Sequence, residues 1–210
     1  MSDFTGADPF PHVVLDNIWP AELLMGVAAE AIMALQHAPW KRFQSDDEVK
    51  LEGSDPAYWG PYTRQLWSQI ANGTFCDTIE QMTGLRAFWD YYGGGWHVIP
   101  TGGRLGVHTD YNRHPSGLYR RLNMLIFLNP KWDDYGGHLE LHNDEECVVT
   151  VSPEFNRTVI MESSDRSWHG HPVPTQHRTR MSFAAYAFTP DPGPSYTSDH
   201  STIYRRSTDA

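Results

Sequence analysis

The chain has no long apolar run and almost no cysteine. A run of about 18 apolar residues, the length that a membrane-spanning helix needs, does not occur in its 210 residues. The opening MSDFTGADPFPHVVLD has neither the basic region nor the apolar core of a secretory signal. Two cysteines, Cys76 and Cys147, are too few for a disulfide framework and fit a reducing compartment. We therefore expect a cytoplasmic protein that does not bind a membrane.

Positive charge is also scarce. Sixteen Lys and Arg residues stand against 26 Asp and Glu residues, which gives a formal net charge of −10. This balance argues against nucleic acid and anionic membranes as partners. Apolar residues make up 40% of the chain and 13% of its residues are aromatic, which is typical of a folded globular protein rather than a disordered one.

Two different kinds of segment follow one another along the chain. Apolar residues at helical spacing predict helices over 19–38 and 63–82, and the polar stretch between them, 42–61, is predicted to be a long loop. From residue 85 onward, short β-rich runs alternate with loop signals such as Gly-Gly, Asn-Pro and Ser-Pro. These runs are RAFWDYY, GWHVIP, RLGVHTD, LNMLIFLN, HLELH, CVVTV, TVIMES and RMSFAAYAF.

Helices followed by many short strands predict the α+β class. We expect a sandwich or jelly-roll barrel supported by N-terminal helices, and the length fits a single domain over 1–210. Within it, residues 1–84 form the mainly helical support and 85–188 the β core. The Pro- and Ser-rich tail, 189–210, is expected to wrap the surface or fray.

A possible metal site begins with His108 and Asp110. Residues two apart on an extended strand point to the same face, so these two side chains can hold one small object together. Two further histidines, His169 and His171, precede a strand-forming segment. Two imidazoles and one carboxylate form the facial set that holds Fe(II) and leaves coordination positions open. Spacing alone does not decide whether His169 or His171 is the third ligand.

Three ordered blocks of sequence then indicate a family. They are GGWHVIPTGGRLGVHTDYNRHP, RRLNMLIFLNPKWDDYGGHLEL, and SWHGHPVP followed by RTRMSFAAYAF. Together they resemble the 2-oxoglutarate and Fe(II)-dependent oxygenases of the prolyl-4-hydroxylase-like branch. The opening PFPHVVLDNIWPAELL is similar to the N-terminal strand and helix of that family. The resemblance implies a double-stranded β-helix (jelly-roll) core, with Fe(II) as cofactor, 2-oxoglutarate as cosubstrate and O2 as oxidant.

The resemblance also implies roles for individual residues. His108, Asp110 and His169 would be the catalytic iron ligands, with His171 two positions further on in the wall of the pocket. Strand alternation places Arg178 and Arg180 on one face, but the Arg–x–Ser pattern of the family matches Arg180. The residues implied to contact 2-oxoglutarate are Arg180, Ser182, Asn123 and Tyr92.

The activity implied is hydroxylation of an unactivated C–H bond, with release of succinate and CO2. The carboxylate of Asp110 favours hydroxylation over halogenation, because related halogenases lack it. The small size favours a small-molecule substrate, an amino acid or a natural-product intermediate, over the alternative of a peptidyl-prolyl hydroxylase. A cupin-like metalloprotein that does not use 2-oxoglutarate, a binding module without activity and a zinc hydrolase are further alternatives.

The substrate pocket is expected to form from residues 111–121 and from the irregular segment 45–61. Within the first of these, Arg113, Arg120 and Arg121 have two possible roles. All three can meet an anionic group of the substrate, or Arg120 and Arg121 can instead flank a strand and form salt bridges.

Overall fold

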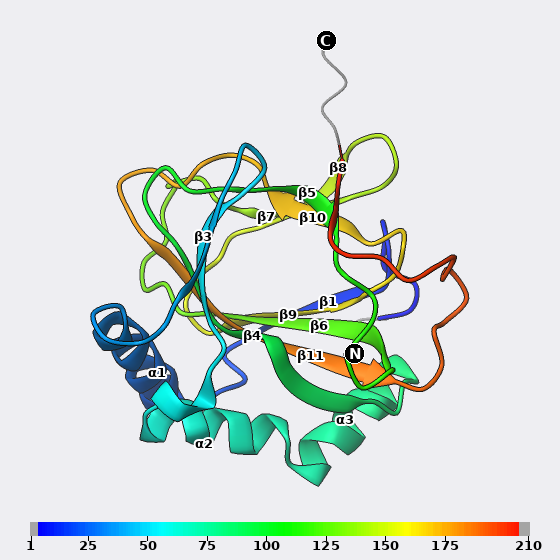
Figure 1. The fold of residues 1–210 in the computed structure, drawn as a ribbon, viewed down its shortest axis with the longest axis horizontal. Coiled ribbons are helices and arrows are strands. Elements are labelled where there is room, and N and C mark those ends of the chain that lie inside the picture. The colour runs from blue at the N-terminus through cyan, green and yellow to red at the C-terminus, as the bar shows by residue number, and fades with distance from the viewer. Residues whose placement is uncertain (1–3, 206–210) are drawn as a thin grey trace.

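Two antiparallel sheets face each other and three helices cover the outer side of the larger one (Figure 1). The computed structural model describes residues 4–205. The larger sheet has the strand order β1-β9-β6-β11-β4-β3-β2, and the smaller sheet has the order β12-β5-β10-β7-β8. This confirms the predicted jelly-roll core with N-terminal helical support. Within residues 4–205, no helix has the length and apolar character needed to cross a bilayer.

The elements have the following bounds. The helices are α1 Ala21–Ala34, the 3-10 helix η1 Pro56–Tyr58, α2 Pro61–Ile70 and α3 Gly73–Thr83. The strands of the larger sheet are β1 His12–Asp16, β2 Lys41–Gln44, β3 Val49–Gly53, β4 Phe88–Ile99, β6 Tyr119–Phe127, β9 Arg157–Glu162 and β11 Arg180–Thr189. Those of the smaller sheet are β5 Leu105–Thr109, β7 Leu139–His142, β8 Cys147–Val151, β10 Trp168–His171 and β12 Ile203–Tyr204.

Strand β6 contributes side chains to two hydrophobic cores, one on each face of the larger sheet. Its side chains alternate between the two faces of the sheet, as those of every strand do. Leu122, Met124 and Ile126 belong to the core beneath the helices, where they meet side chains such as Leu24 of α1. Leu125 and Phe127 belong to the second core, between the two sheets. The outer face of the larger sheet is covered by the helices, so a ligand site on this sheet would lie on its inner face, between the two sheets.

The N-terminal half departs from expectation in two places. The helix predicted over 63–82 is broken at residues 71–72, because Asn72 caps a new helix by accepting a hydrogen bond from the Thr74 N–H at 2.9 Å. The segment predicted as a long loop, 42–61, contains the β2–β3 hairpin, which adds two strands to the edge of the larger sheet. Its strands are polar and partly exposed, so they lack the apolar alternation that would have revealed them.

The runs predicted as two strands at 86–92 and 95–100 form one strand, β4. The glycines between them carry positive φ angles, 71° at Gly93 and 77° at Gly95, and the register with β11 shifts at this point. Glycine adopts this backbone without the Cβ penalty, so the strand continues through an irregularity instead of ending.

The tail does wrap the surface as far as the structure describes it. Its segment at Ile203–Tyr204 forms β12, which pairs with β5 so that Tyr204 lies opposite His108. Residues 206–210 of the predicted tail lie outside the described residues.

Candidate active site

Three of the predicted ligands meet between the sheets. His108 on β5 lies opposite His169 on the neighbouring strand β10, and their ring centroids are 4.5 Å apart. Asp110, just beyond the end of β5, places its carboxylate oxygens 3.5 Å from Nε2 of each ring. One ligand atom from each of the three residues lies within 4.8 Å of the others, and His171 does not belong to this group. The pairing of β5 with β10 thus joins residues that are 61 positions apart.

Backbone carbonyls fix the two imidazoles in the form that a metal needs. Nδ1 of His108 donates to the Gly106 carbonyl at 2.8 Å, and Nδ1 of His169 donates to the Ser167 carbonyl at 2.8 Å. A carbonyl can only accept, so in each ring the proton sits on Nδ1 and the Nε2 lone pair faces Asp110. Burial, the main cause, lowers the pKa of His169 to about 4, which leaves its ring neutral at neutral pH.

Asp110 is held as a carboxylate by a buried arginine. Burial would raise the pKa of Asp110, but the Arg120 guanidinium and the two histidines outweigh it and hold the pKa well below its usual range. The Arg120 Nη2 donates to Asp110 Oδ2 at 2.7 Å, and the Nδ2 of Asn123 donates to the same oxygen at 3.2 Å. Arg120 is itself stacked on the ring of Tyr186, 3.4 Å from its centroid. The second carboxylate oxygen, Oδ1, faces His108.

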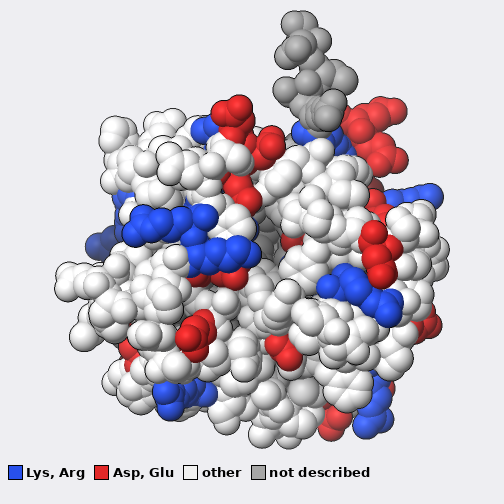
Figure 2. Space-filling model, in the orientation of Figure 1, with Lys and Arg blue, Asp and Glu red and all other residues white. Residues whose placement is uncertain are grey.

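Two cavities meet at these ligands. The outer one, of about 620 Å³, opens to solvent between the β2–β3 hairpin and the tail. Figure 2 shows a hollow near the middle of this face, with Lys or Arg and Asp or Glu side chains beside it. The inner cavity lies deeper between the sheets. The residues that line both are Lys50, His108, Asp110 and Tyr186.

Arg180 and Ser182 both line the inner cavity, from neighbouring inward positions of β11. The Nε of Arg180 donates to the Gly137 carbonyl at 2.8 Å, and its guanidinium lies over the Phe127 ring. Burial lowers the pKa of Arg180 to about 9, which still leaves it charged at neutral pH. Among residues 4–205 it forms no ion pair with a carboxylate, so this buried cation is free to bind an anion.

Arg178, the other arginine on this face, is placed differently. Its Nη1 donates to the Lys131 carbonyl at 2.7 Å, and its guanidinium lies over the rings of Trp132 and Tyr135. It does not line the inner cavity among the described residues. The structure therefore separates the two arginines that strand alternation left equivalent.

Two other predicted residues, Asn123 and Tyr92, have different positions. Asn123 lines the inner cavity, where its Nδ2 donates to Asp110 and its buried Oδ1 has no hydrogen-bond partner among the described residues. Tyr92 is 46% exposed at the outer cavity, against the rings of Tyr111 and His114. Tyr92 is not one of the described residues that line the inner cavity, and its contact with 2-oxoglutarate stays a prediction.

The sequence did not predict that Arg120 and Tyr186 lie at the centre of the candidate site. Arg120 was expected either to meet a substrate or to form a salt bridge, and it pairs with the candidate ligand Asp110. Arg121 instead pairs with Glu162 at 3.4 Å, away from the cavities. Tyr186 follows Arg180 and Ser182 at even spacing on β11, so alternation along that strand would have placed it on the inner face.

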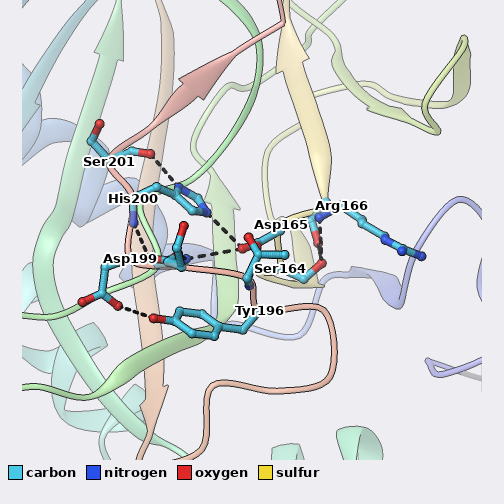
Figure 3. A network of polar contacts seen from close by, with 11 residues as sticks. Ser164, Asp165, Arg166, Tyr196, Asp199, His200 and Ser201 are labelled. Atoms are coloured by element: carbon cyan, nitrogen blue, oxygen red, sulfur yellow. Dashed lines mark hydrogen bonds and ion pairs between the residues drawn. The ribbon is translucent and has the colours of Figure 1, made fainter.

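A polar network fastens the tail beside the outer cavity (Figure 3). Asp165 accepts hydrogen bonds from the backbone and hydroxyl of Thr197, at 2.8 and 2.7 Å, and its Oδ1 lies 3.0 Å from Nε2 of His200. Asn112 donates to the Ser198 carbonyl at 2.8 Å and accepts from the His200 N–H at 3.0 Å. The network holds the segment that supplies His200 and Tyr204 to the cavity wall.

Comparison with known proteins finds a matching family model and similar folds. The model of the 2OG-Fe(II) oxygenase superfamily matches residues 94–188, which contain the three candidate ligands and Arg180. A prolyl-4-hydroxylase from Pseudomonas putida has a similar structure, with a TM-score of 0.67 and 18% identity over 84% of this chain and 91% of that one. A prolyl hydroxylase from Trichoplax adhaerens, solved with a hypoxia inducible factor peptide fragment, gives a TM-score of 0.57 and 20% identity over 84% and 83% of the two chains. No curated protein sequence matches.

Fold, candidate ligands and family match together indicate an oxygenase enzyme. Residues 94–188 are similar to the 2OG-Fe(II) oxygenase superfamily, whose members use Fe(II), 2-oxoglutarate and O2. The residues present fit these groups, because two neutral imidazoles and a carboxylate suit Fe(II). The unpaired Arg180 suits a carboxylate, with which its planar fork can form two hydrogen bonds.

Proposed function

We propose that the protein hydroxylates an unactivated C–H bond of a small molecule, an amino acid or a natural-product intermediate, with release of succinate and CO2. The observation that carries the proposal is the meeting of His108, Asp110 and His169 at the junction of an outer and an inner cavity. This arrangement gives the substrate and the cosubstrate separate approaches to one metal. Fe(II), when bound with 2-oxoglutarate and O2, supplies the oxidising chemistry.

The chain's own residues bind and orient these groups. His108, Asp110 and His169 would hold the metal, and the guanidinium of Arg180 with the hydroxyl of Ser182 would bind the far carboxylate of 2-oxoglutarate. Arg120 keeps Asp110 ionised and oriented. Arg180 and Ser182 are both buried, and burial strengthens polar contacts of this kind.

The character of the outer cavity supports a small substrate with charges of both signs. A volume of about 620 Å³ lies within the range of small-molecule sites. Lys50 and Arg113 line it together with the acidic residues Glu52 and Asp90. A free amino acid carries an ammonium and a carboxylate, and this lining can meet both. Tyrosines on the wall, among them Tyr111, provide apolar surface for a side chain.

A peptidyl-proline substrate is the second candidate. It is favoured by the similarity to prolyl hydroxylases, one of which was solved with a peptide fragment. The two candidates are separated by measuring succinate release with a panel of free amino acids and with proline-containing peptides. Turnover of peptides alone would overturn the small-molecule proposal and leave the oxygenase assignment intact.

The metal and cosubstrate sites are tested by anaerobic titration of the metal-free protein with Fe(II) and then 2-oxoglutarate. We expect the visible charge-transfer band of the Fe(II)–2-oxoglutarate chelate in the unaltered protein. Arg180→Ala should weaken the band, and His169→Ala should abolish it. Arg178→Ala is the matched control, because Arg178 lies over the rings of Trp132 and Tyr135 and does not line the inner cavity among the described residues, and it should leave the band unchanged.

Each other outcome has a definite meaning. Absence of the band in the unaltered protein despite bound iron would contradict the use of 2-oxoglutarate and favour the cupin-like alternative. A band that survives in His169→Ala would move the third ligand to His171.

A further inference from the structure

The inner cavity contains a second buried polar group that the proposed function does not use. His171 is 2% exposed, and neither of its ring nitrogens has a hydrogen-bond partner among the described residues. It lines the inner cavity together with Arg180, which is 4% exposed. Leaving a buried donor and acceptor unpaired is unfavourable, so native structures rarely keep such groups without a ligand or water.

The strand geometry aims His171 at this cavity. His169 and His171 are two apart on β10, so their side chains share a face. His169 lies opposite His108 and next to the metal group, whereas His171 lies opposite Leu105, further along the strand. A shift in register separates the two positions. The first histidine therefore belongs to the ligands and the second to the Arg180 end of the cavity.

The surroundings of His171 call for an anion. Two cationic side chains, those of Arg180 and Lys50, line the inner cavity with His171, and both can only donate hydrogen bonds. The one carboxylate that lines it among the described residues, Asp110, belongs to the candidate metal ligands. An oxygen-rich anion beside Arg180 can accept from the guanidinium and from an imidazole N–H at the same time. Apolar side chains, those of Ile99, Leu105, Leu125 and Leu139, also line the inner cavity. A carboxylate on a short hydrocarbon chain satisfies both the polar and the apolar parts.

We propose that His171 is a specificity-determining residue that donates a hydrogen bond to the far carboxylate of 2-oxoglutarate, beside Arg180. The inference rests on the proposed function and adds to it a second group that selects a dicarboxylate over a 2-oxo monocarboxylate. The third-ligand role, which the sequence left open for this residue, belongs to His169 in this assignment.

The test compares two cosubstrates and two variants by calorimetric binding to the Mn(II)-loaded protein, so activity is not the readout. The cosubstrates are 2-oxoglutarate and 2-oxopentanoate, which has the same chain length and lacks the far carboxylate. His171→Val removes the donor at similar bulk, and His171→Asn restores an N–H. Hydrogen bonds to charged groups predict that His171→Val weakens 2-oxoglutarate binding by about tenfold or more. It should leave 2-oxopentanoate binding unchanged, and His171→Asn should recover part of the loss.

The outcomes distinguish failure of this inference from failure of the proposed function on which it rests. Equal loss for both ligands, or no loss for either, would overturn the role of His171 while 2-oxoglutarate binding by the unaltered protein stands. Loss of Mn(II) itself in His171→Val would make His171 a metal ligand and likewise overturn the inference. If the unaltered Mn(II) protein binds neither 2-oxo acid, the proposed function fails first. Circular dichroism of each variant verifies that it is folded.

Discussion

The contact between Arg120 and Asp110 shows how one buried charge controls another. Arg120 is 2% exposed and has one carboxylate partner among the described residues, Asp110, at 2.7 Å. Its guanidinium lies over the rings of Tyr111 and Tyr186. The Arg120 side chain is buried and that of Asp110 is 14% exposed at the outer cavity, so each charge depends largely on the other for compensation.

We expect Arg120→Met to lower the free energy of unfolding of the metal-free protein by about 3 kcal/mol, because it leaves Asp110 as an unpaired buried carboxylate. Arg120→Lys keeps the charge and should lose less. Arg121→Met is the matched control, since its partner Glu162 lies on a more exposed edge. Urea denaturation at neutral pH measures all three. Equal stability of Arg120→Met and the unaltered protein would show that the pair contributes nothing net.

Elements differ in how far the sequence alone could place them. The helices of the N-terminal half follow from apolar spacing, and only the break before Gly73 was missed, although Asn72-Gly73 is a signal for it. The β2–β3 hairpin was missed because its strands lie at a sheet edge, where charged residues such as Lys41 and Lys50 replace apolar alternation. Residue propensity and apolar alternation therefore do not predict strands of this kind.

The sequence predicts which residues form the candidate site, but it does not predict how they are arranged in space. The spacing of His108 and Asp110, and the family blocks, identified residues that the fold brings together. The pairing of β5 with β10, and the ion pair of Arg120 with Asp110, depend on long-range contacts that no local pattern contains. The same holds for the separation of Arg178 from Arg180, which lie on one face of the chain but end in different surroundings.

Two glycines, one in the irregular part of β4 and one at the start of α3, should respond differently to substitution by alanine. At Gly95, φ is 77° and an added Cβ would lie 2.5 Å from the Gly53 carbonyl oxygen, so Gly95→Ala should destabilise the protein by about 2 kcal/mol or more. At Gly73, in the first turn of α3, an added Cβ meets nothing within 4 Å. Gly73→Ala should be neutral or stabilising. Thermal unfolding of the two variants compares them directly, and a loss at Gly73 matching that at Gly95 would contradict the steric argument.

The tail network predicts a dependence on acid. Burial would raise the pKa of Asp165, but hydrogen bonds from Thr197, His200 and Asn112 lower it below its ordinary value of about 3.9. The depressed pKa means that the ionised carboxylate stabilises the docked tail. This contribution is fully present above about pH 4 and is lost as the pH falls through the lowered pKa.

Hydrogen exchange of residues 195–205, corrected for the intrinsic rate, measures this contribution. Protection should be constant from about pH 8 to pH 5 and should fall below about pH 4. In Asp165→Asn, the exchange should already be faster at neutral pH, while the strands of the larger sheet keep their protection. Tail exchange in Asp165→Asn that equals that of the unaltered protein at neutral pH would show that another contact holds the segment.

The whole molecule is a sandwich of two sheets, with a buried cation, Arg180, that has no carboxylate partner among the described residues. The helices pack on the outer face of the larger sheet, whereas Arg180 from that sheet and His171 from the smaller sheet line the inner cavity. Neither ring nitrogen of His171 has a hydrogen-bond partner among the described residues. We propose that residues 1–210 work as one domain in which the helical part supports the sheet and the sheets hold the site. On this view, ligands that supply the missing charges stabilise the entire fold.

This coupling predicts a rise in melting temperature when the site is filled. A ligand present at 100 times its dissociation constant stabilises the folded state by about 2.7 kcal/mol. For a chain of this size about 1 kcal/mol shifts the midpoint by about 2–4 °C, so Mn(II) with 2-oxoglutarate should raise it by about 5–10 °C. In His169→Ala the shift should vanish, because the metal is no longer held between the sheets. In Arg180→Ala the shift due to Mn(II) should remain and the increment due to 2-oxoglutarate should be lost. A 2-oxoglutarate increment that persists in Arg180→Ala would mean that the cosubstrate is held by other residues, and calorimetry on that variant would then locate the contribution of His171.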